Sequence, residues 1–115
     1  MTTCAQEYEK KRTTPEDAIR LVKNGTTVVY GMSISQPPAL LMAFANAARA
    51  GTLNGVRLYT FLPREHAARS VLKPDLCDCL LNYSWFVGAA DRDMVKVGLD
   101  YFVPSYLHQI PKLVS

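Results

Sequence analysis

The sequence has no long apolar run: no stretch approaches the ~20 consecutive apolar residues that a transmembrane helix requires. Its first residues, Met1 to Arg12, are polar and charged, without the apolar centre of a secretory signal peptide. We therefore expect a cytoplasmic protein that has no membrane partner. At 49% hydrophobic and 20% charged, the 115 residues exclude a disordered chain and are typical of one soluble globular domain.

Cysteine and histidine are scarce. The three cysteines, Cys4, Cys77 and Cys79, are odd in number, which favours free, partly buried thiols in a reducing compartment. The C-x-C pair has no second pair or nearby histidine to complete a set of four zinc ligands, so we expect no metal site. We interpret His66 and His108 as surface or hydrogen-bonded structural residues.

The sequence also has little excess positive charge. The net charge is +3, and Lys10 to Arg12 form the only basic run, which indicates a solvated surface and no nucleic-acid partner. Neither of the glycine-rich phosphate-binding patterns, GxxxxGK and GxGxxG, occurs. The segment 31–35, GMSIS, lacks the second glycine of a serine-hydrolase elbow, and two prolines follow it, so we do not expect serine hydrolysis.

What the sequence does contain is an alternation of helix and strand patterns. Helical patterns begin at Thr14-Pro15, at Pro37-Pro38 and at Asp91, and residues 64–72 and 105–110 are compatible with short helices. Apolar runs over 26–30, 56–62, 80–87 and 101–103 predict four strands. The order predicts an α/β fold: a mostly parallel open sheet with flanking helices. In the third strand, Tyr83, Trp85 and Phe86 are expected in the core.

Parallel sheets bind ligands at the carboxyl ends of their strands, so the candidate site residues follow the predicted strands. They are Gly31, Met32, Ser33, Gln36, Pro63, Arg64, Glu65, Gly88 and Arg92.

Each group of candidates has its own chemistry. The loop 31–36 would receive a carboxylate or carbonyl oxygen on its backbone N–H groups, and Met32 would shape the pocket. Arg64 would contact an anion, although a solvated helix face with Glu65 paired to Arg69 is the alternative. Arg92 opposes a helix dipole, so a ligand or partner would explain its presence.

Several segments carry a resemblance to a known family. They are LYTFLP at 58–63, NYSWFVG at 82–88, DYFVP at 100–104 and YLHQIPKL at 106–113. From about Thr14 onward the chain resembles the acetyl-CoA hydrolase/transferase family. Within that family its motifs are most similar to those of the 4-hydroxybutyrate CoA-transferases and their itaconate- and butyrate-using relatives. Relatives often carry Pro-Asn after the glycine, where this chain has Ala89-Ala90.

The resemblance implies a reaction and its participants. In this family an acyl-CoA and a small carboxylate exchange CoA, and the active site lies between two tandem α/β domains. A glutamate attacks the thioester to form an acyl anhydride and then a glutamyl-CoA thioester, while backbone N–H groups stabilise the oxyanions. CoA is a substrate, and no cofactor is permanently bound.

The resemblance also implies how the chain is organised. Residues 1–13 would be a polar N-terminal segment, and 14–115 an incomplete N-terminal CoA-transferase domain that lacks the second, catalytic domain. The glutamate belongs to that second domain, so we expect no catalytic residue in this chain, no activity of the chain alone, and a homo-oligomer. Glu65 is not the nucleophile, because its context does not match the catalytic motif.

Four alternatives remain. The chain could be a non-catalytic module that binds acyl-CoA or a carboxylate, a separate subunit of a two-chain transferase, or part of an acyl-CoA hydrolase. It could also have a sugar-phosphate isomerase-like fold, which would need Glu65 as its general base.

Overall fold

Four short strands pair side by side in chain order, and every pair is parallel. In the computed structural model, which describes residues 1–115, they are β1 (Thr27–Val29), β2 (Val56–Thr60), β3 (Leu80–Ser84) and β4 (Asp100–Phe102). The predicted α/β fold with an open parallel sheet is therefore confirmed. Each strand lies within or one residue from its predicted run, because β-branched and aromatic residues favour the pleated, half-buried backbone.

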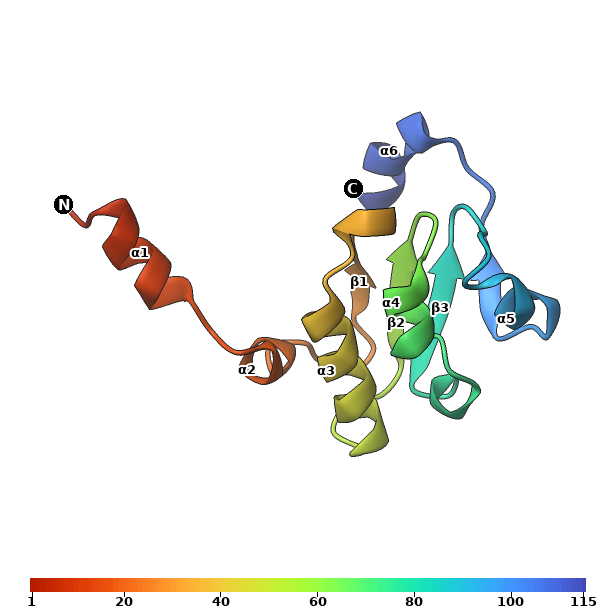
Figure 1. Cartoon of the computed structure of the whole chain (residues 1–115), viewed down its shortest axis with the longest axis horizontal. Helices are drawn as coiled ribbons and strands as arrows, with labels where there is room; N and C mark the ends of the chain where they lie inside the picture. The colour runs from red at the N-terminus through yellow and green to blue at the C-terminus, as the bar shows by residue number, and fades with distance from the viewer.

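Helices connect the strands and cover one face of the sheet (Figure 1). The α-helices of this part are α2 (Pro15–Ile19), α3 (Pro38–Arg49), α4 (Glu65–Arg69), α5 (Arg92–Lys96) and α6 (Ile110–Val114), and the 3₁₀ turns are η1 (Ser33–Ser35), η2 (Pro74–Leu76) and η3 (Leu107–Gln109). None of the helices combines the length and apolar character needed to cross a membrane. Thr14 caps α2 as predicted, since its Oγ1 accepts a hydrogen bond from the Asp17 N–H at 3.1 Å.

The core lies between α3 and the inner face of the sheet. Leu41, Phe44 and Ala45 of α3 are at most 5% exposed and belong to one buried cluster with Leu58 and Leu80 of the strands. Burial of such side chains contributes roughly 1.5–3 kcal/mol each. This packing fixes the carboxyl ends of β1, β2 and β3 relative to one another.

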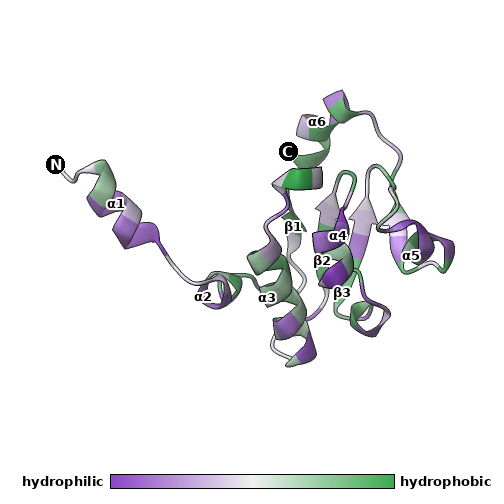
Figure 2. Cartoon of the chain, viewed as in Figure 1, coloured by the Kyte–Doolittle hydropathy of each residue, from purple (hydrophilic) through white to green (hydrophobic).

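The polar segment 1–13 contains a helix that the sequence analysis did not predict, α1 (Cys4–Lys11). Thr3 Oγ1 accepts from the Gln6 N–H at 3.2 Å, and Gln6 Oε1 accepts from the Thr3 N–H at 2.9 Å. This reciprocal capping box stabilises a helix that has no buried residue. In Figures 1 and 2, α1 projects away from the sheet and is mostly hydrophilic.

The opposite face of the sheet carries a row of aromatic side chains. Val29, Tyr59, Tyr83 and Tyr101 share one register line across the four strands. The rings of Tyr59 and Tyr83 stack at 4.5 Å, and those of Tyr83 and Tyr101 at 5.0 Å. Val29 and Tyr101 remain 48% exposed, so this face is only partly covered.

The core prediction for the third strand is right in part. Trp85 is buried at 4% exposure and Tyr83 is half-buried, but Phe86 is 49% exposed, so its assignment to the core is wrong. The reason is that β3 ends at Ser84, and Phe86 lies in the following loop, where its ring stacks on Phe61 at 5.4 Å.

The structure also tests the predictions for the three cysteines and for the segment before Pro111. The three cysteines are free, and Cys77 and Cys79 are partly buried as predicted. Cys4 is exposed, so the prediction of a partly buried thiol is wrong there, because its helix packs no residue into a core. The helical turn expected over 105–110 is present as η3, but Pro111 does not end it. Pro111 lies in the first turn of α6, where its missing N–H leaves no helical hydrogen bond unmade.

Candidate active site

A cavity of about 520 Å³ opens where the loops after β1, β2 and β3 meet. It lies at the carboxyl ends of the strands, where parallel sheets place their ligands. The lining residues are Ser33, Ile34, Leu62, Pro63, Arg64, Glu65, His66, Ala68, Ala89 and Ala90.

The structure brings four of the nine predicted site residues, Ser33, Pro63, Arg64 and Glu65, into the lining of this cavity. The other five are outside the lining. Gln36, Gly31 and Gly88 lie in the loops that form the walls, while Met32 and Arg92 are exposed.

The wall after β1 is a tight turn. Ser33 has a left-handed backbone (φ 50°), which costs a non-glycine residue roughly 1–3 kcal/mol and is found most often at functional sites. Gly31 is required beside it, because a Cβ at that position would collide with the carbonyl group of Ser35. The sequence GMSIS therefore forms a compact 3₁₀ turn that presents Ser33 and Ile34 to the cavity.

Gln36 joins this wall to the next. Its side chain is 3% exposed, and its Oε1 accepts a hydrogen bond from the Arg64 backbone N–H at 3.2 Å. Its Nε2 is buried without any acceptor in the chain. Buried polar groups are nearly always hydrogen-bonded, so this amide is an unsatisfied donor inside the wall.

The wall after β2 is packed against the loop after β3. Leu62 also has a left-handed backbone (φ 54°), and its N–H donates to the Phe86 carbonyl at 3.0 Å. A Cβ on Gly88 would lie 2.7 Å from Leu62 Cδ1, so a larger residue there would require the Leu62 side chain to shift. The two non-glycine residues with positive φ, Ser33 and Leu62, both line the cavity.

Two charged residues of opposite sign, Arg64 and Glu65, line the cavity. Glu65 pairs with Arg69 at 3.3 Å on the surface of α4, as the alternative for this helix face predicted. Arg64 is exposed and forms no ion pair, so its guanidinium is free to bind an anion.

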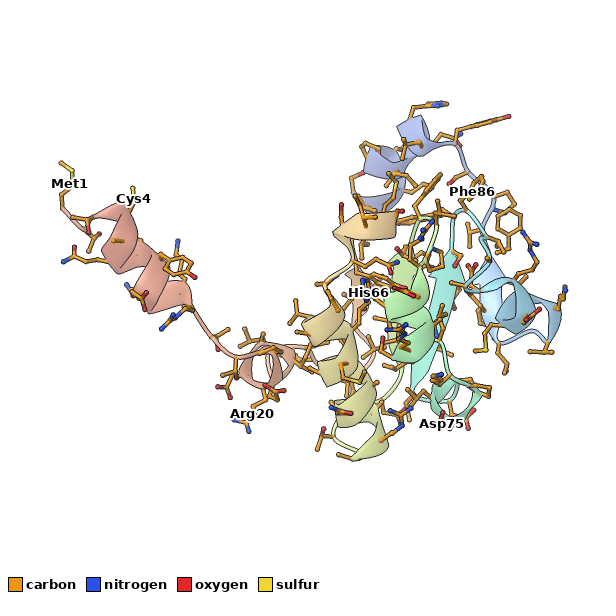
Figure 3. The ribbon with its side chains drawn as sticks, viewed as in Figure 1. Met1, Cys4, Arg20, His66, Asp75 and Phe86 are labelled. Carbon is orange, nitrogen blue, oxygen red and sulfur yellow. The ribbon has the colours of Figure 1, made fainter.

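Sequence analysis missed His66 as a lining residue. His66 lies half-buried in the first turn of α4 (Figure 3), and it belongs to the lining of the cavity. The available signal was its position directly after Arg64 and Glu65 at a predicted strand end, but a lone histidine has no partner in the sequence that indicates a role.

A second group that the sequence did not indicate lies buried behind the loop after β3. Asp91 Oδ1 accepts a hydrogen bond from the Gly88 N–H at 2.7 Å, and Asp100 Oδ2 accepts one from the Ser84 hydroxyl at 3.0 Å. Burial, with the charge of Asp91 adding to it, raises the pKa of Asp100 to about 7. Burial and the charges of both aspartates raise the pKa of Tyr30 far above its usual range, so Tyr30 stays neutral.

The fold defines a parallel α/β domain with a cavity at the carboxyl ends of its strands. The chain belongs to the acetyl-CoA hydrolase/transferase family: the N-terminal domain of that family matches residues 2–115.

Two curated relatives are CoA-transferases. The succinyl-CoA:cyclohexane-1-carboxylate CoA transferase of Geobacter metallireducens is 28% identical over 109 residues, 95% of this chain and 24% of that protein. The butyryl-CoA:acetate CoA-transferase of Anaerostipes caccae is 29% identical over 110 residues, 92% of this chain and 23% of that protein. The chain thus spans about a quarter of the length of these relatives.

A solved structure supports the same relationship. The crystal structure of RipA from Yersinia pestis superimposes with a TM-score of 0.86 at 34% identity, covering 92% of this chain and 26% of RipA. The four-stranded parallel sheet and its flanking helices therefore match the N-terminal part of RipA.

Proposed function

We propose that these 115 residues form the N-terminal part of a CoA-transferase that moves CoA between a short-chain acyl-CoA and a carboxylic acid. The observation that carries this proposal is the family match over residues 2–115, to which the two CoA-transferase relatives add support. Acids of the class of 4-hydroxybutyrate, butyrate and itaconate are the substrates that we propose. CoA is a substrate of the reaction, with no resident cofactor.

The proposed chemistry is nucleophilic catalysis by a glutamate that lies outside these residues. Its carboxylate attacks the thioester carbonyl and the C–S bond breaks, which gives an acyl–glutamyl anhydride and releases CoA as a thiolate. The thiolate then attacks the glutamyl carbonyl, which releases the first acid and forms glutamyl-CoA. The carboxylate of the second acid then attacks the glutamyl-CoA carbonyl, which releases the CoA thiolate and forms a second anhydride. The thiolate attacks the acyl carbonyl of this anhydride, which frees the glutamate and gives the new acyl-CoA.

In this proposal the cavity holds the acyl group and the acceptor acid. Arg64, free of any ion pair, binds the carboxylate, and the unpartnered Gln36 Nε2 donates to a carbonyl or carboxylate oxygen. Ile34, Ala89 and Ala90 form the apolar side against a short acyl chain. Gly31, Ser33, Pro63 and Gly88 shape the walls.

Three of the proposed site residues have other roles. Glu65 is held by Arg69 on an exposed helix face, which supports a role at the rim of the site and disfavours one as nucleophile or general base. Met32 and Arg92 are exposed, and we propose that they contact substrate or the remainder of the site.

The organisation of the protein is part of the proposal. Residues 14–115 supply part of an N-terminal CoA-transferase domain, and a second, catalytic domain completes the active site. We propose a homo-oligomer in the cytoplasm, where the free thiols of the chain would persist.

The test is an assay of the natural protein with acetyl-CoA and butyrate, in which acetyl-CoA, butyryl-CoA and free CoA are separated and measured. Transfer predicts butyryl-CoA that depends on butyrate. Free CoA without butyryl-CoA would support the acyl-CoA hydrolase alternative. Binding of acyl-CoA without turnover would support the non-catalytic module.

A further inference from the structure

Two aspartates are buried next to each other behind the loop Gly88–Ala90. Asp91 directly follows this loop and is 0% exposed, and Asp100 begins β4 and is 2% exposed. Neither forms an ion pair with a lysine, arginine or histidine. Two charged carboxylates buried without a cation would repel each other strongly, because neither water nor a counter-charge screens them.

Each aspartate has one oxygen bonded and one oxygen free. Asp91 Oδ1 accepts from the Gly88 N–H, and Asp100 Oδ2 accepts from the Ser84 hydroxyl. Asp91 Oδ2 and Asp100 Oδ1 are buried with no donor when both carboxyls are ionised. The two side chains lie within hydrogen-bonding reach of each other. One proton placed between them gives both free oxygens a partner and halves the buried charge.

No side chain around the pair donates to the two free oxygens. Asn82, opposite Asp100 in the sheet, directs its amide N–H groups to the carbonyls of Val71 and Leu80 at 3.2 and 3.3 Å. Thr60 directs its hydroxyl to the carbonyls of Tyr30 and Gly31. Tyr30 is a further titratable group near the pair; it remains neutral, and its hydroxyl is not hydrogen-bonded to either free oxygen.

We propose that Asp91 and Asp100 share a single proton as a carboxylic acid–carboxylate pair, and that this pair positions the Gly88–Ala90 loop at the wall of the cavity. Asp91 holds the loop through the Gly88 N–H, and the shared proton ties Asp91 to β4. Loss of the proton leaves two adjacent buried charges, which push Asp91 and the loop away from the sheet. Only the effect on substrate binding rests on the proposed function.

The pair makes the stability of the protein depend on pH in a defined direction. An unfolded aspartate has a pKa of about 3.9, whereas the pKa of Asp100 in the folded protein is about 7. The folded protein therefore binds the proton more tightly than the unfolded chain does. Its contribution to stability is complete below about pH 4 and is lost as the pH rises through about 7.

The first experiment measures the thermal unfolding midpoint of the natural protein from about pH 5 to about pH 8, with infrared difference spectra over the same range. We expect the contribution of the pair to lower the midpoint as the pH rises, and the carbonyl band of a protonated carboxylic acid to disappear. Asp100→Asn supplies a permanent amide donor, so it should remove the band and flatten this part of the slope. Asp93→Asn, at an exposed position of α5, should leave both unchanged.

Two results would overturn the pair: absence of the acid band in the unmodified protein, or an Asp100→Asn slope equal to that of the unmodified protein. These measurements do not use activity. A protein with the band and the slope but without CoA transfer would contradict only the proposed function.

The second experiment tests the positioning role by activity. Asp91→Ala removes the bond to the Gly88 N–H and should raise the KM for the carboxylate several-fold more than it lowers kcat. Asp91→Asn retains an oxygen that accepts from Gly88 and should restore the KM. Equal KM values in Asp91→Ala and the unmodified protein would contradict the positioning role, and if Asp91→Ala does not fold, the pH slope of Asp100→Asn decides the proposal.

Discussion

The side-chain carbonyl of Gln36 accepts a hydrogen bond from the backbone N–H of Arg64 at 3.2 Å, across 28 residues of sequence. This bond joins the loop after β1 to the loop after β2 at the edge of the candidate site. It holds the Arg64 backbone where the cavity begins and leaves the Gln36 Nε2 without a partner in the chain. The site is thus built from two loops that a buried glutamine fixes to each other.

Replacement of Gln36 by leucine should weaken substrate binding as well as the fold. The change leaves the partly buried Arg64 N–H without its acceptor, which lowers the free energy of unfolding by about 0.5–1.5 kcal/mol. We expect a rise in the KM for the carboxylate of about fivefold or more. Gln36→Glu retains the acceptor for Arg64 but removes the amide donor, so it separates the two roles.

Gln109→Leu is the matched control, since Gln109 forms a similar bond to the Tyr106 N–H at 2.8 Å on the exposed surface. An unchanged KM in Gln36→Leu would contradict the role of this residue.

Removal of the Arg64 guanidinium should weaken binding of the acid. A charge-assisted hydrogen bond contributes about 1.5–3 kcal/mol, so Arg64→Ala should raise the KM for the carboxylate about tenfold or more, and Arg64→Lys should recover part of it. Arg69→Ala removes an arginine of the same helix region that pairs only with Glu65 and should change the KM little. Equal effects of the two alanine variants would show that Arg64 acts only through the surface charge.

A methyl group on Gly88 should disturb the contact between two loops. The added Cβ lies 2.7 Å from Leu62 Cδ1, the end of a flexible side chain, so Leu62 must shift its rotamer and Gly88→Ala should lower the free energy of unfolding by about 0.5–1.5 kcal/mol. Leu62→Gly removes the side chain and relieves the left-handed backbone of Leu62. In that background Gly88→Ala should have little effect, as measured by chemical denaturation. If Gly88→Ala lowered the free energy of unfolding equally with and without the Leu62 side chain, a steric origin would be contradicted.

The isolated 115-residue chain should self-associate. Val29 and Tyr101, at the two ends of the aromatic row, are each 48% exposed on a partly covered sheet face, and such apolar patches favour association. Light scattering should give a mass above 12.8 kDa, and Tyr101→Lys should reduce it. A stable monomer of 12.8 kDa at high protein concentration would contradict this prediction.

Local sequence patterns predicted the strands and most helices because each of these elements depends on its own residues. The runs at 26–30 and 80–87 are rich in residues that suit a buried parallel strand, and Thr14-Pro15 is a helix start that requires no distant partner. The helix α1 was missed although Thr3 and Gln6 form a capping box, because the segment offers no apolar periodicity.

The carboxyl-end loops were found from strand order, but their internal contacts were not. The bond between Gln36 and Arg64 and the approach of Asp91 to Asp100 depend on how loops and strands pack. Two aspartates nine positions apart in the sequence carry no sign there that both are buried and adjacent. Phe86 was misplaced for a related reason, since the sequence did not show that β3 ends two residues earlier.

The most direct test of the CoA-transferase proposal is the intact mass of the natural protein before and after incubation with an acyl-CoA. The account predicts a mass well above 12.8 kDa and a CoA-sized gain that hydroxylamine removes, because hydroxylamine cleaves a glutamyl thioester. No gain in mass with any short-chain acyl-CoA would contradict a glutamyl-CoA intermediate and with it the proposed reaction.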